Sequence, residues 1–441
     1  ISNFNLYFYQ GEGSSLSTGL FGCISKNGVV KNLTISALSY HDSQSLACVG
    51  IVAAINYGAI INCHTDGGDI YISSPGNDYA GGVVGINCGY IYSCTNKISI
   101  FLESGISFGG GHLGGITAVN YHVVKGCVNY GQLGCKDVCN AGGIVGTSGY
   151  QERSDHPANN TIEDCINYGE LYANSTWGLA NLGGIVGESL GKITRCGNYG
   201  SITQHSVNNT QTVGGLIGTM SASGTTPNVM TDCFNRGNLT FVVTAEGNNK
   251  IAYMGGFCGL GGLGGSASFI RCYNAGKMSA MDGVKVAPFY VRNTNGDNIV
   301  SFKDCFMEEG CTDSVSDDGL TVSLSQLAAL TDTFNVDKRA SAWVLSSDGY
   351  PELRPLPSGY MTSDAPVYYN PFDVTFPVAI VNIQDNCYLE YKKQDGDNTV
   401  NTVTVDHTKG FQLFNVSGLK SGTPYYYRLR ASNGYVTEWK E

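Results

Sequence analysis

A cysteine returns at near-regular intervals between residues 63 and 305 of this chain. Successive members of the set are 31 to 39 residues apart, and most follow a glycine-led apolar run such as Gly142-Gly143-Ile144-Val145-Gly146. A recurring unit of this size indicates a stacked repeat, in which each unit buries its apolar side only against its neighbours. The recurring residues are Cys63, Cys94, Cys127, Cys165, Cys196, Cys233, Cys272 and Cys305.

The short segments of each unit predict strands. Their apolar residues are often β-branched, and glycine or asparagine separates them, which is typical of strands and turns. A period near 31 residues fits one coil of three short strands, and coils in register place parallel strands about 4.8 Å apart. We therefore expect residues 1–322 to form an all-β parallel β-helix, or β-solenoid, of about eight to nine coils.

In-register stacking predicts two buried columns of side chains. Stacked thiols in an apolar interior act as small hydrophobes, so we expect most of the recurring cysteines to be buried and free. The sequence leaves open whether any cysteines are bridged; Cys135 with Cys139 is the first candidate pair, and Cys305 with Cys311 is the next. A C-x-N-x-G motif begins at five of the recurring cysteines, and its stacked amides are expected to bond the backbone of the turns. These asparagines are Asn129, Asn167, Asn198, Asn235 and Asn274.

A third column carries alternating charge. The residues directly before five successive recurring cysteines change sign from one coil to the next. We expect their side chains to form an external ladder, in which each pair of opposite charges contributes roughly 0.2–1 kcal/mol. The residues are Asp164, Arg195, Asp232, Arg271 and Asp304.

The pattern changes after the last recurring cysteine. Ser323 and Gln326 fit a capping box at the start of a short helix, so residues 323–357 are expected to cap the open end of the solenoid. Proline and glycine near residues 358–362 indicate a linker. Alternating apolar and polar residues then predict a β-sandwich over residues 363–441.

Two parts of the chain resemble known families. The glycine-led strand followed by C-x-N-x-G resembles the GLUG repeat of bacterial surface proteins, including large secreted proteins of gut Bacteroidetes. Residues 416–431 resemble the late strands of an immunoglobulin-like fibronectin type III domain, with Tyr425 in the place of its corner tyrosine. The GLUG resemblance implies adhesion, outer-membrane-anchored at the cell surface or secreted, and carries over no catalytic residue. Ile1 stands in mid-pattern, so we expect a signal region before it.

Charge and apolar patterning argue against several classes of protein. The net charge of −11 disfavours nucleic acid as a partner, because its binders carry basic patches. No apolar run reaches the roughly 20 residues of a membrane span. No paired histidines or second C-x-x-C accompany the cysteines, so we expect no metal and no other cofactor.

Two short motifs match catalytic signatures outside their proper context. Gly187-Glu188-Ser189-Leu190-Gly191 fits a nucleophile elbow, but Ser189 falls on a repeat corner instead of a strand-to-helix turn. Residues 259–264 fit a dinucleotide-binding pattern without the helix that it requires. β-Helices often host enzymes that cleave polysaccharides with paired carboxylates, but the recurring aspartates alternate with arginines. We therefore expect no catalytic residue.

Binding has better candidates in the sequence. One repeat position, between the asparagine and the glycine, is a tyrosine in three successive coils: Tyr130, Tyr168 and Tyr199. Stacked exposed tyrosines suit contacts with sugars or proteins, although they could also serve only to pack the corner. An insertion over residues 147–161 adds a second group of candidates, Tyr150, Arg153, Asp155 and His156.

These features favour a non-catalytic adhesin or binding module. It would hold a glycan or a host or microbial surface protein along the side of the solenoid through many weak contacts, and we expect it to be a monomer. Two alternatives stay open from the sequence. One is a polysaccharide-degrading enzyme on a β-helix, and the other is a passive stalk that presents another domain.

Overall fold

The computed structural model of the chain divides into two compact units. One unit contains nearly all residues up to Arg354, and the other contains the residues from Pro355 onward. The described residues are 17–42, 48–74, 78–104, 110–137, 139–149, 160–175, 179–206, 211–221, 228–243, 252–261, 266–292, 299–312, 320–335, 342–364, 366–370, 372–394 and 399–441.

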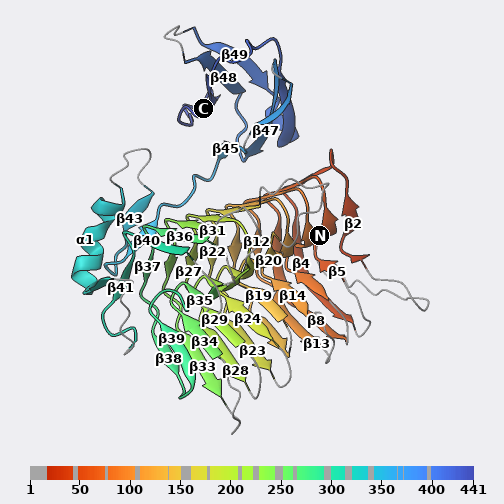
Figure 1. Cartoon of the computed structure of the whole chain (residues 1–441). Coiled ribbons are helices and arrows are strands. Elements are labelled where there is room, and N and C mark those ends of the chain that lie inside the picture. The colour runs from red at the N-terminus through yellow and green to blue at the C-terminus, as the bar shows by residue number, and fades with distance from the viewer. Residues whose placement is uncertain are drawn as a thin grey trace. The chain divides into compact units, whose positions relative to one another are not determined.

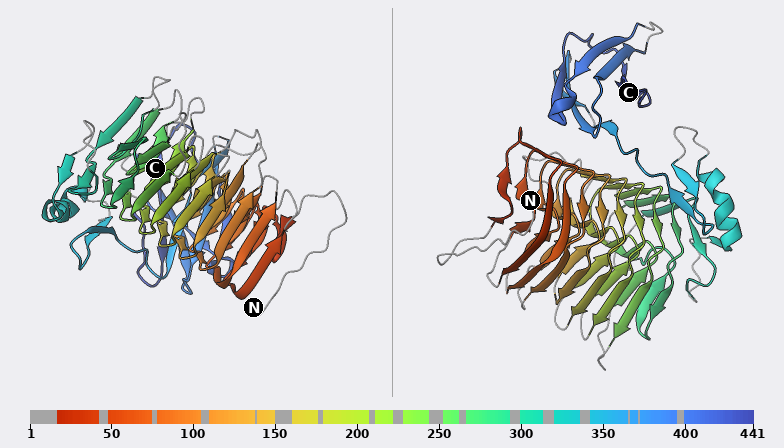
Figure 2. Two further views of the ribbon diagram at one scale, coloured as in Figure 1. Left: turned by 90° about the horizontal axis from the view of Figure 1, so that it is seen from below. Right: turned by 180° about the vertical axis from the view of Figure 1, so that it is seen from behind.

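The first unit is a solenoid of parallel strands (Figure 1). Its strands form four sheets, and in each sheet the coils follow one another in chain order. Figure 2 shows the same strands side by side from two other directions. Neighbouring coils pair in register, as Asn129 does with Asn167 and Asn167 with Asn198. This nearly all-β arrangement of parallel sheets is the one expected of a β-solenoid.

Three of the four sheets take one strand from each coil, except that the described part of the coil with β39 and β40 gives no strand to the second sheet. The first sheet contains β1 (Ser17–Thr18), β5 (Cys48–Gly50), β9 (Tyr79–Gly81), β14 (Gly111–Gly114), β19 (Cys139–Gly142), β24 (Ala180–Gly183), β29 (Gln211–Gly214), β34 (Ala252–Gly255) and β39 (Val284–Ala287). The second contains β2 (Phe21–Ile24), β6 (Ala53–Asn56), β10 (Val84–Asn87), β15 (Thr117–Asn120), β20 (Val145–Ser148), β25 (Val186–Ser189), β30 (Ile217–Met220) and β35 (Cys258–Gly261). The third contains β3 (Val29–Lys31), β7 (Ala59–Ile61), β11 (Tyr90–Tyr92), β16 (Val123–Lys125), β21 (Thr161–Glu163), β26 (Lys192–Thr194), β31 (Asn228–Thr231), β36 (Ser266–Ile270) and β40 (Ile299–Lys303).

The fourth sheet takes two strands from most coils and so has two tracks. Both tracks start from β4 (Thr34–Asp42) and β8 (His64–Ser74). The short track continues with β12 (Thr95–Asn96), β17 (Val128–Asn129), β22 (Ile166–Asn167), β27 (Gly197–Asn198), β32 (Phe234–Asn235), β37 (Tyr273–Asn274), β41 (Phe306–Glu308) and β42 (Leu320–Val322). The long track continues with β13 (Ser99–Ser104), β18 (Leu133–Lys136), β23 (Leu171–Ser175), β28 (Ile202–Ser206), β33 (Leu239–Val243) and β38 (Met278–Ala280).

A typical coil therefore has five short strands, and the expectation of three was wrong. The coil from β9 to β13 is divided at a pair of glycines, where a Cβ on Gly81 would lie 1.9 Å from the carbonyl oxygen of Val84. It is divided again before Cys94, because Ser93 has a left-handed backbone with φ of 52°. Both features turn the chain too sharply for one strand to continue.

The recurring cysteines form a buried column of free thiols, which confirms the expectation. Neighbouring coils are linked through sulfur, since the Cys94 backbone N–H donates to Cys127 Sγ over 3.4 Å. Cys135 and Cys139, the first candidate pair, form a disulfide. The next candidate pair, Cys305 with Cys311, is not bridged.

The asparagine column is buried and continuously hydrogen-bonded, as expected. In each of the five asparagines, the side-chain carbonyl or amide bonds the backbone two residues later, in the turn that follows the strand. The amides of the first four also donate to the next asparagine up the stack, at 2.8 Å from Asn129 Nδ2 to Asn167 Oδ1. This column therefore fixes both the turn and the register of the coils.

The charged column lies at the corner before the cysteines. All five of its residues have left-handed backbones, with φ between 52° and 55°. Arg195 pairs with Asp164, and Arg271 Nε lies 2.6 Å from Asp232 Oδ1. Part of this ladder is buried and not external as expected, because the side chain of Asp232 is 10% exposed and accepts a hydrogen bond from Trp343 Nε1 at 3.0 Å.

The segment after the solenoid forms one helix and one hairpin. Helix α1 (Leu324–Phe334) starts at Ser323, whose side chain and backbone both bond Gln326, so the capping box is confirmed. Strands β43 (Trp343–Leu345) and β44 (Pro351–Leu353) pair antiparallel. Together they bury a cluster made of Phe234, Tyr273, Phe306, Val322, Leu327, Phe334 and Trp343. Three of these aromatic residues belong to three successive coils of the short track, so this segment packs along the side of the solenoid.

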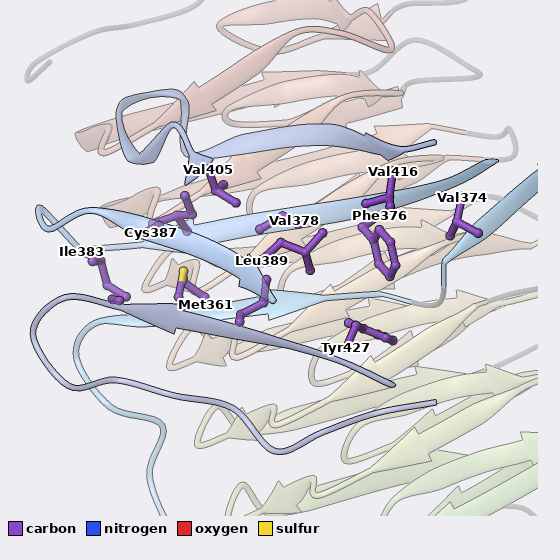
Figure 3. Close-up of a cluster of buried hydrophobic side chains, with 13 residues drawn as sticks. Met361, Val374, Phe376, Val378, Ile383, Cys387, Leu389, Val405, Val416 and Tyr427 are labelled. Atoms are coloured by element: carbon purple, nitrogen blue, oxygen red, sulfur yellow. The ribbon is translucent and has the colours of Figure 1, made fainter. Parts of the chain in front are cut away.

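The second unit consists of two antiparallel sheets. One contains β45 (Tyr360–Ser363), β46 (Val367–Asn370), β47 (Asp373–Val381) and β50 (Phe411–Val416), and the other contains β48 (Cys387–Lys393), β49 (Asn401–Val405) and β51 (Tyr425–Ala431), with a short 3-10 helix at His407–Lys409. Side chains from both sheets point toward one another and form a shared core (Figure 3). Strand β45 begins inside the segment expected to be a linker.

Candidate binding surface

The tyrosine ladder, Tyr130, Tyr168 and Tyr199, lies along the short track. Each tyrosine directly follows the asparagine that ends its strand. Its backbone N–H donates to the asparagine carbonyl of the preceding coil, at 2.8 Å for Tyr168 to Asn129 and for Tyr199 to Asn167. Alternate residues of a strand point to opposite faces, so an inward asparagine directs the next side chain outward.

The three rings stack almost parallel to one another. The centroids of Tyr130 and Tyr168 are 5.0 Å apart with 4° between the planes, and those of Tyr168 and Tyr199 are 4.8 Å apart with 9°. Tyr130 is 51% exposed and Tyr168 is 45% exposed, whereas Tyr199 is partly buried. The spacing matches that of neighbouring strands, so the backbone holds the rings in place before any ligand arrives.

Stacking decides which parts of the rings a ligand can reach. Neighbouring rings cover one another's faces, so the ladder presents phenol edges and hydroxyl groups to solvent. Burial raises the pKa of both Tyr168 and Tyr199, and the carboxylate of Glu352 adds to the effect on Tyr199. At neutral pH these hydroxyls therefore stay protonated and can donate hydrogen bonds.

The chain itself occupies one end of the ladder. The hydroxyl of Tyr199 donates to Glu352 Oε1 at 2.9 Å. The guanidinium of Arg236 lies 5.3 Å from the centre of the Tyr199 ring and 4.1 Å from the centre of the Tyr350 ring. Arg236 and Tyr350 thus extend the stack by cation–π contacts, and Arg236 Nη1 also lies 3.0 Å from Glu352 Oε1.

The opposite end of the ladder is open and has an apolar border. In the preceding coil the equivalent position is Lys97, whose Nζ lies 3.1 Å from Asp66 Oδ1. Val128 and Ile166 stand two residues before the exposed tyrosines on the same strands, and both are partly exposed. The accessible surface of the ladder is therefore the Tyr130 and Tyr168 edges with an aliphatic strip beside them.

Other candidates from the sequence are placed differently. Tyr150, Arg153, Asp155 and His156 lie outside the described residues, as does most of the insertion over 147–161. Ser189 is 1% exposed and pairs with Ser148, which itself pairs with Asn120, so it occupies a structural corner of the repeat. Within the described ranges, no three or more histidine, cysteine, aspartate or glutamate residues are grouped as a metal site would require.

A second asparagine column occupies the repeat corner that holds Ser189 in a later coil. Asn56 Nδ2 donates to Asn87 Oδ1 at 2.8 Å, and Asn87 Nδ2 donates to Asn120 Oδ1 at 2.8 Å. All three residues stand seven positions before a recurring cysteine. This column supports the corner between the second and third sheets.

A partly exposed aromatic pair on the long track was missed in the sequence. Phe101 and Tyr172 face outward in one column, and their ring centroids are 6.0 Å apart with 48° between the planes. Between them in the stack lies Gly134. Each of these three residues stands seven positions after a recurring cysteine, which is the signal that identifies the column.

The second unit contains a cavity of about 390 Å³ between its two sheets. Apolar side chains from both sheets line it, including Val374, Phe376, Val416 and Tyr427, which face one another in Figure 3. Polar groups stand among the lining residues, as with Lys420. The volume falls within the range of small-molecule sites.

Comparison of the chain with protein-family models, with curated proteins and with solved structures finds no match. In the part of the chain that the structure describes, no helix has the length and apolar character needed to cross a membrane. The assignment of a function therefore depends on the surfaces described above.

Proposed function

We propose that this chain is a non-catalytic adhesin or binding module, which holds a glycan or a surface protein along the side of its solenoid. The observation that carries the proposal is the open half of the tyrosine ladder, where Tyr130 and Tyr168 are 51% and 45% exposed in a fixed stack. Exposed aromatic residues on a rigid scaffold lose little conformational entropy when they bind, which favours their use in recognition.

The covered half of the ladder supports the same proposal. There, Tyr199 already contacts an arginine, a carboxylate and an aromatic neighbourhood supplied by the chain. A partner that carries similar groups could engage the two open tyrosines in the same way. The aliphatic strip of Val128 and Ile166 would add apolar contact to such a complex.

The two family resemblances found in the sequence suggest where such a protein would act and what its second unit is. A GLUG-type repeat favours a cell-surface or secreted protein of the kind found in Bacteroidetes, and adhesion is the role that fits it. A fibronectin type III-like identity for the second unit is supported by two antiparallel sheets around one core. It is also supported by the bond from the Lys420 backbone N–H to the Tyr425 hydroxyl at 3.1 Å, as at a tyrosine corner.

The test is binding of the whole chain to arrays of host and microbial glycans and mucin-type glycoproteins, followed by recovery of the bound ligand. We expect intact ligand. Replacing both Tyr130 and Tyr168 with alanine should weaken binding about tenfold, since each aromatic contact is worth roughly 0.5–1.5 kcal/mol. Tyr57→Ala is the matched control, because Tyr57 is 39% exposed and follows β6 at another corner.

Three other results of this experiment would contradict the proposal. Shortened ligand would favour the polysaccharide-degrading enzyme. If Tyr57→Ala weakened binding as much as the Tyr130 and Tyr168 double variant does, the tyrosine ladder would not be the contact surface. Absence of any ligand on either array would favour a passive stalk.

A further inference from the structure

The long track carries an aromatic ring in a different orientation from the ladder. The ring of Tyr172 reaches across the neighbouring strand and fills the space over Gly134, where a Cβ would lie 2.4 Å from its Cζ and 2.6 Å from its hydroxyl oxygen. Any larger residue at position 134 would push the ring away. The missing side chain thus lets the phenol lie over the sheet instead of standing on edge.

The same arrangement, an aromatic ring that covers a glycine of the preceding coil, occurs a second time in the molecule. A Cβ on Gly197 would lie 2.3 Å from Cζ of Phe234, so that ring also covers a glycine of the preceding coil. Phe234 is 0% exposed because the segment with Trp343 packs over it, with ring centroids 6.1 Å apart. Tyr172, in contrast, is 38% exposed. The planes of Phe234 and Trp343 meet at 56°, so a ring laid over a glycine is a surface that another aromatic group can pack against.

Polar groups border this platform on one side. Glu103 stands two residues after Phe101 on the same strand, and Lys136 stands two residues after Gly134, so both face outward beside it. Lys136 Nζ lies 2.6 Å from Glu103 Oε1, and the side chains are 50% and 37% exposed. The hydroxyl of Tyr71 donates to Glu103 Oε2 at 2.5 Å. Donors and acceptors are thus held in a row next to an aromatic face.

We propose that the surface formed by Phe101, Gly134 and Tyr172 binds a neutral hexopyranose unit of a glycan. A pyranose ring has an apolar C–H side that packs on an aromatic face, and its hydroxyl groups both donate and accept hydrogen bonds. Glu103 and Lys136 offer one acceptor and one donor in reach of such a ring. Apolar contact with a few placed polar groups is the usual composition of a small-ligand site. The inference rests on the proposed binding function and names a ligand class and a second surface for it.

The experiment uses the full chain and neutral oligosaccharides built from glucose, galactose or mannose. Binding is measured by calorimetry and by saturation-transfer NMR, which reports the sugar protons that lie closest to the protein. We expect Tyr172→Ala to weaken binding roughly two- to twelvefold, which is the range for one aromatic contact of about 0.5–1.5 kcal/mol. Gly134→Ala removes no contacting group, yet it should also weaken binding because it displaces the ring. Thermal unfolding of each variant shows whether it has folded.

Three results would overturn the inference. The first is unchanged affinity in folded Tyr172→Ala and Gly134→Ala variants. The second is a failure of every neutral oligosaccharide to bind the unaltered chain. The proposed function survives the second result if a glycoprotein still binds and the Tyr130 and Tyr168 double variant loses it, so the two failures are distinguishable. Loss of oligosaccharide binding in Tyr57→Ala would likewise refute a site on the long track.

Discussion

Replacing Asn167 with alanine should destabilise the solenoid more than the small change in volume implies. Its side chain is 0% exposed, with Nδ2 donating to Gly169 O at 2.9 Å and to Asn198 Oδ1 at 2.8 Å. Its Oδ1 accepts from Gly169 N–H at 3.1 Å and from Asn129 Nδ2 at 2.8 Å. At about 1 kcal/mol for each of these hydrogen bonds, the loss in unfolding free energy is roughly 4 kcal/mol, within a range of about 2–6 kcal/mol.

Urea denaturation followed by circular dichroism measures this loss. Hydrogen exchange should accompany it, because stacked repeats can open in parts instead of unfolding as one unit. Asn274→Ala is the internal comparison, since Asn274 Nδ2 makes longer contacts, 3.3 Å to Gly276 O and 3.8 Å to Met278 Sδ. We expect it to cost about half as much. A loss below about 1 kcal/mol for Asn167→Ala, or equal losses in the two variants, would refute the role given to the column.

Two further measurements follow from buried groups. The eight recurring cysteines should resist a thiol reagent in the native protein and react only in denaturant, whereas the exposed Cys23 should react at once; rapid native labelling of the whole column would contradict the stacked interior. Burial lowers the pKa of His112 to about 4, from an ordinary value of 6.5, and its Nδ1 lies 2.7 Å from Thr147 Oγ1. The unfolded state therefore binds a proton more readily, so stability should fall by roughly 3 kcal/mol as the pH drops from 6.5 towards 4. Urea midpoints across this pH range test it, and an equal acid loss in His112→Gln would contradict the assignment.

The columns of the solenoid were readable because stacking converts spacing in the sequence into position in space. A residue that recurs at one offset from the cysteine must lie above its equivalent in the next coil. This is why Cys127, Asn167 and Tyr168 could each be assigned to a column, and why the inward or outward direction of each was predictable from strand alternation. The capping box at Ser323 was equally local, since it depends on two residues three positions apart.

Features that depend on contact between columns were not readable in the same way. The division of a coil into five strands depends on how closely the backbone of one strand approaches the glycines of another, as at Gly81. The charged column was expected at the surface, but Asp232 is buried because Trp343, more than a hundred residues later, packs over it. Periodicity contains no information about such a distant segment.

The sequence by itself determined the repeat, the stacking register and the identity of the stacked side chains, because each of these follows from residue types at fixed intervals. Only the tertiary structure decided which parts of those side chains a partner can reach. Tyr168 is stacked between two rings, whereas Tyr172 lies over Gly134 and is 38% exposed, although both are outward tyrosines of neighbouring strands. The difference arises from the side chain in the adjacent coil, which is a ring in one column and a hydrogen atom in the other.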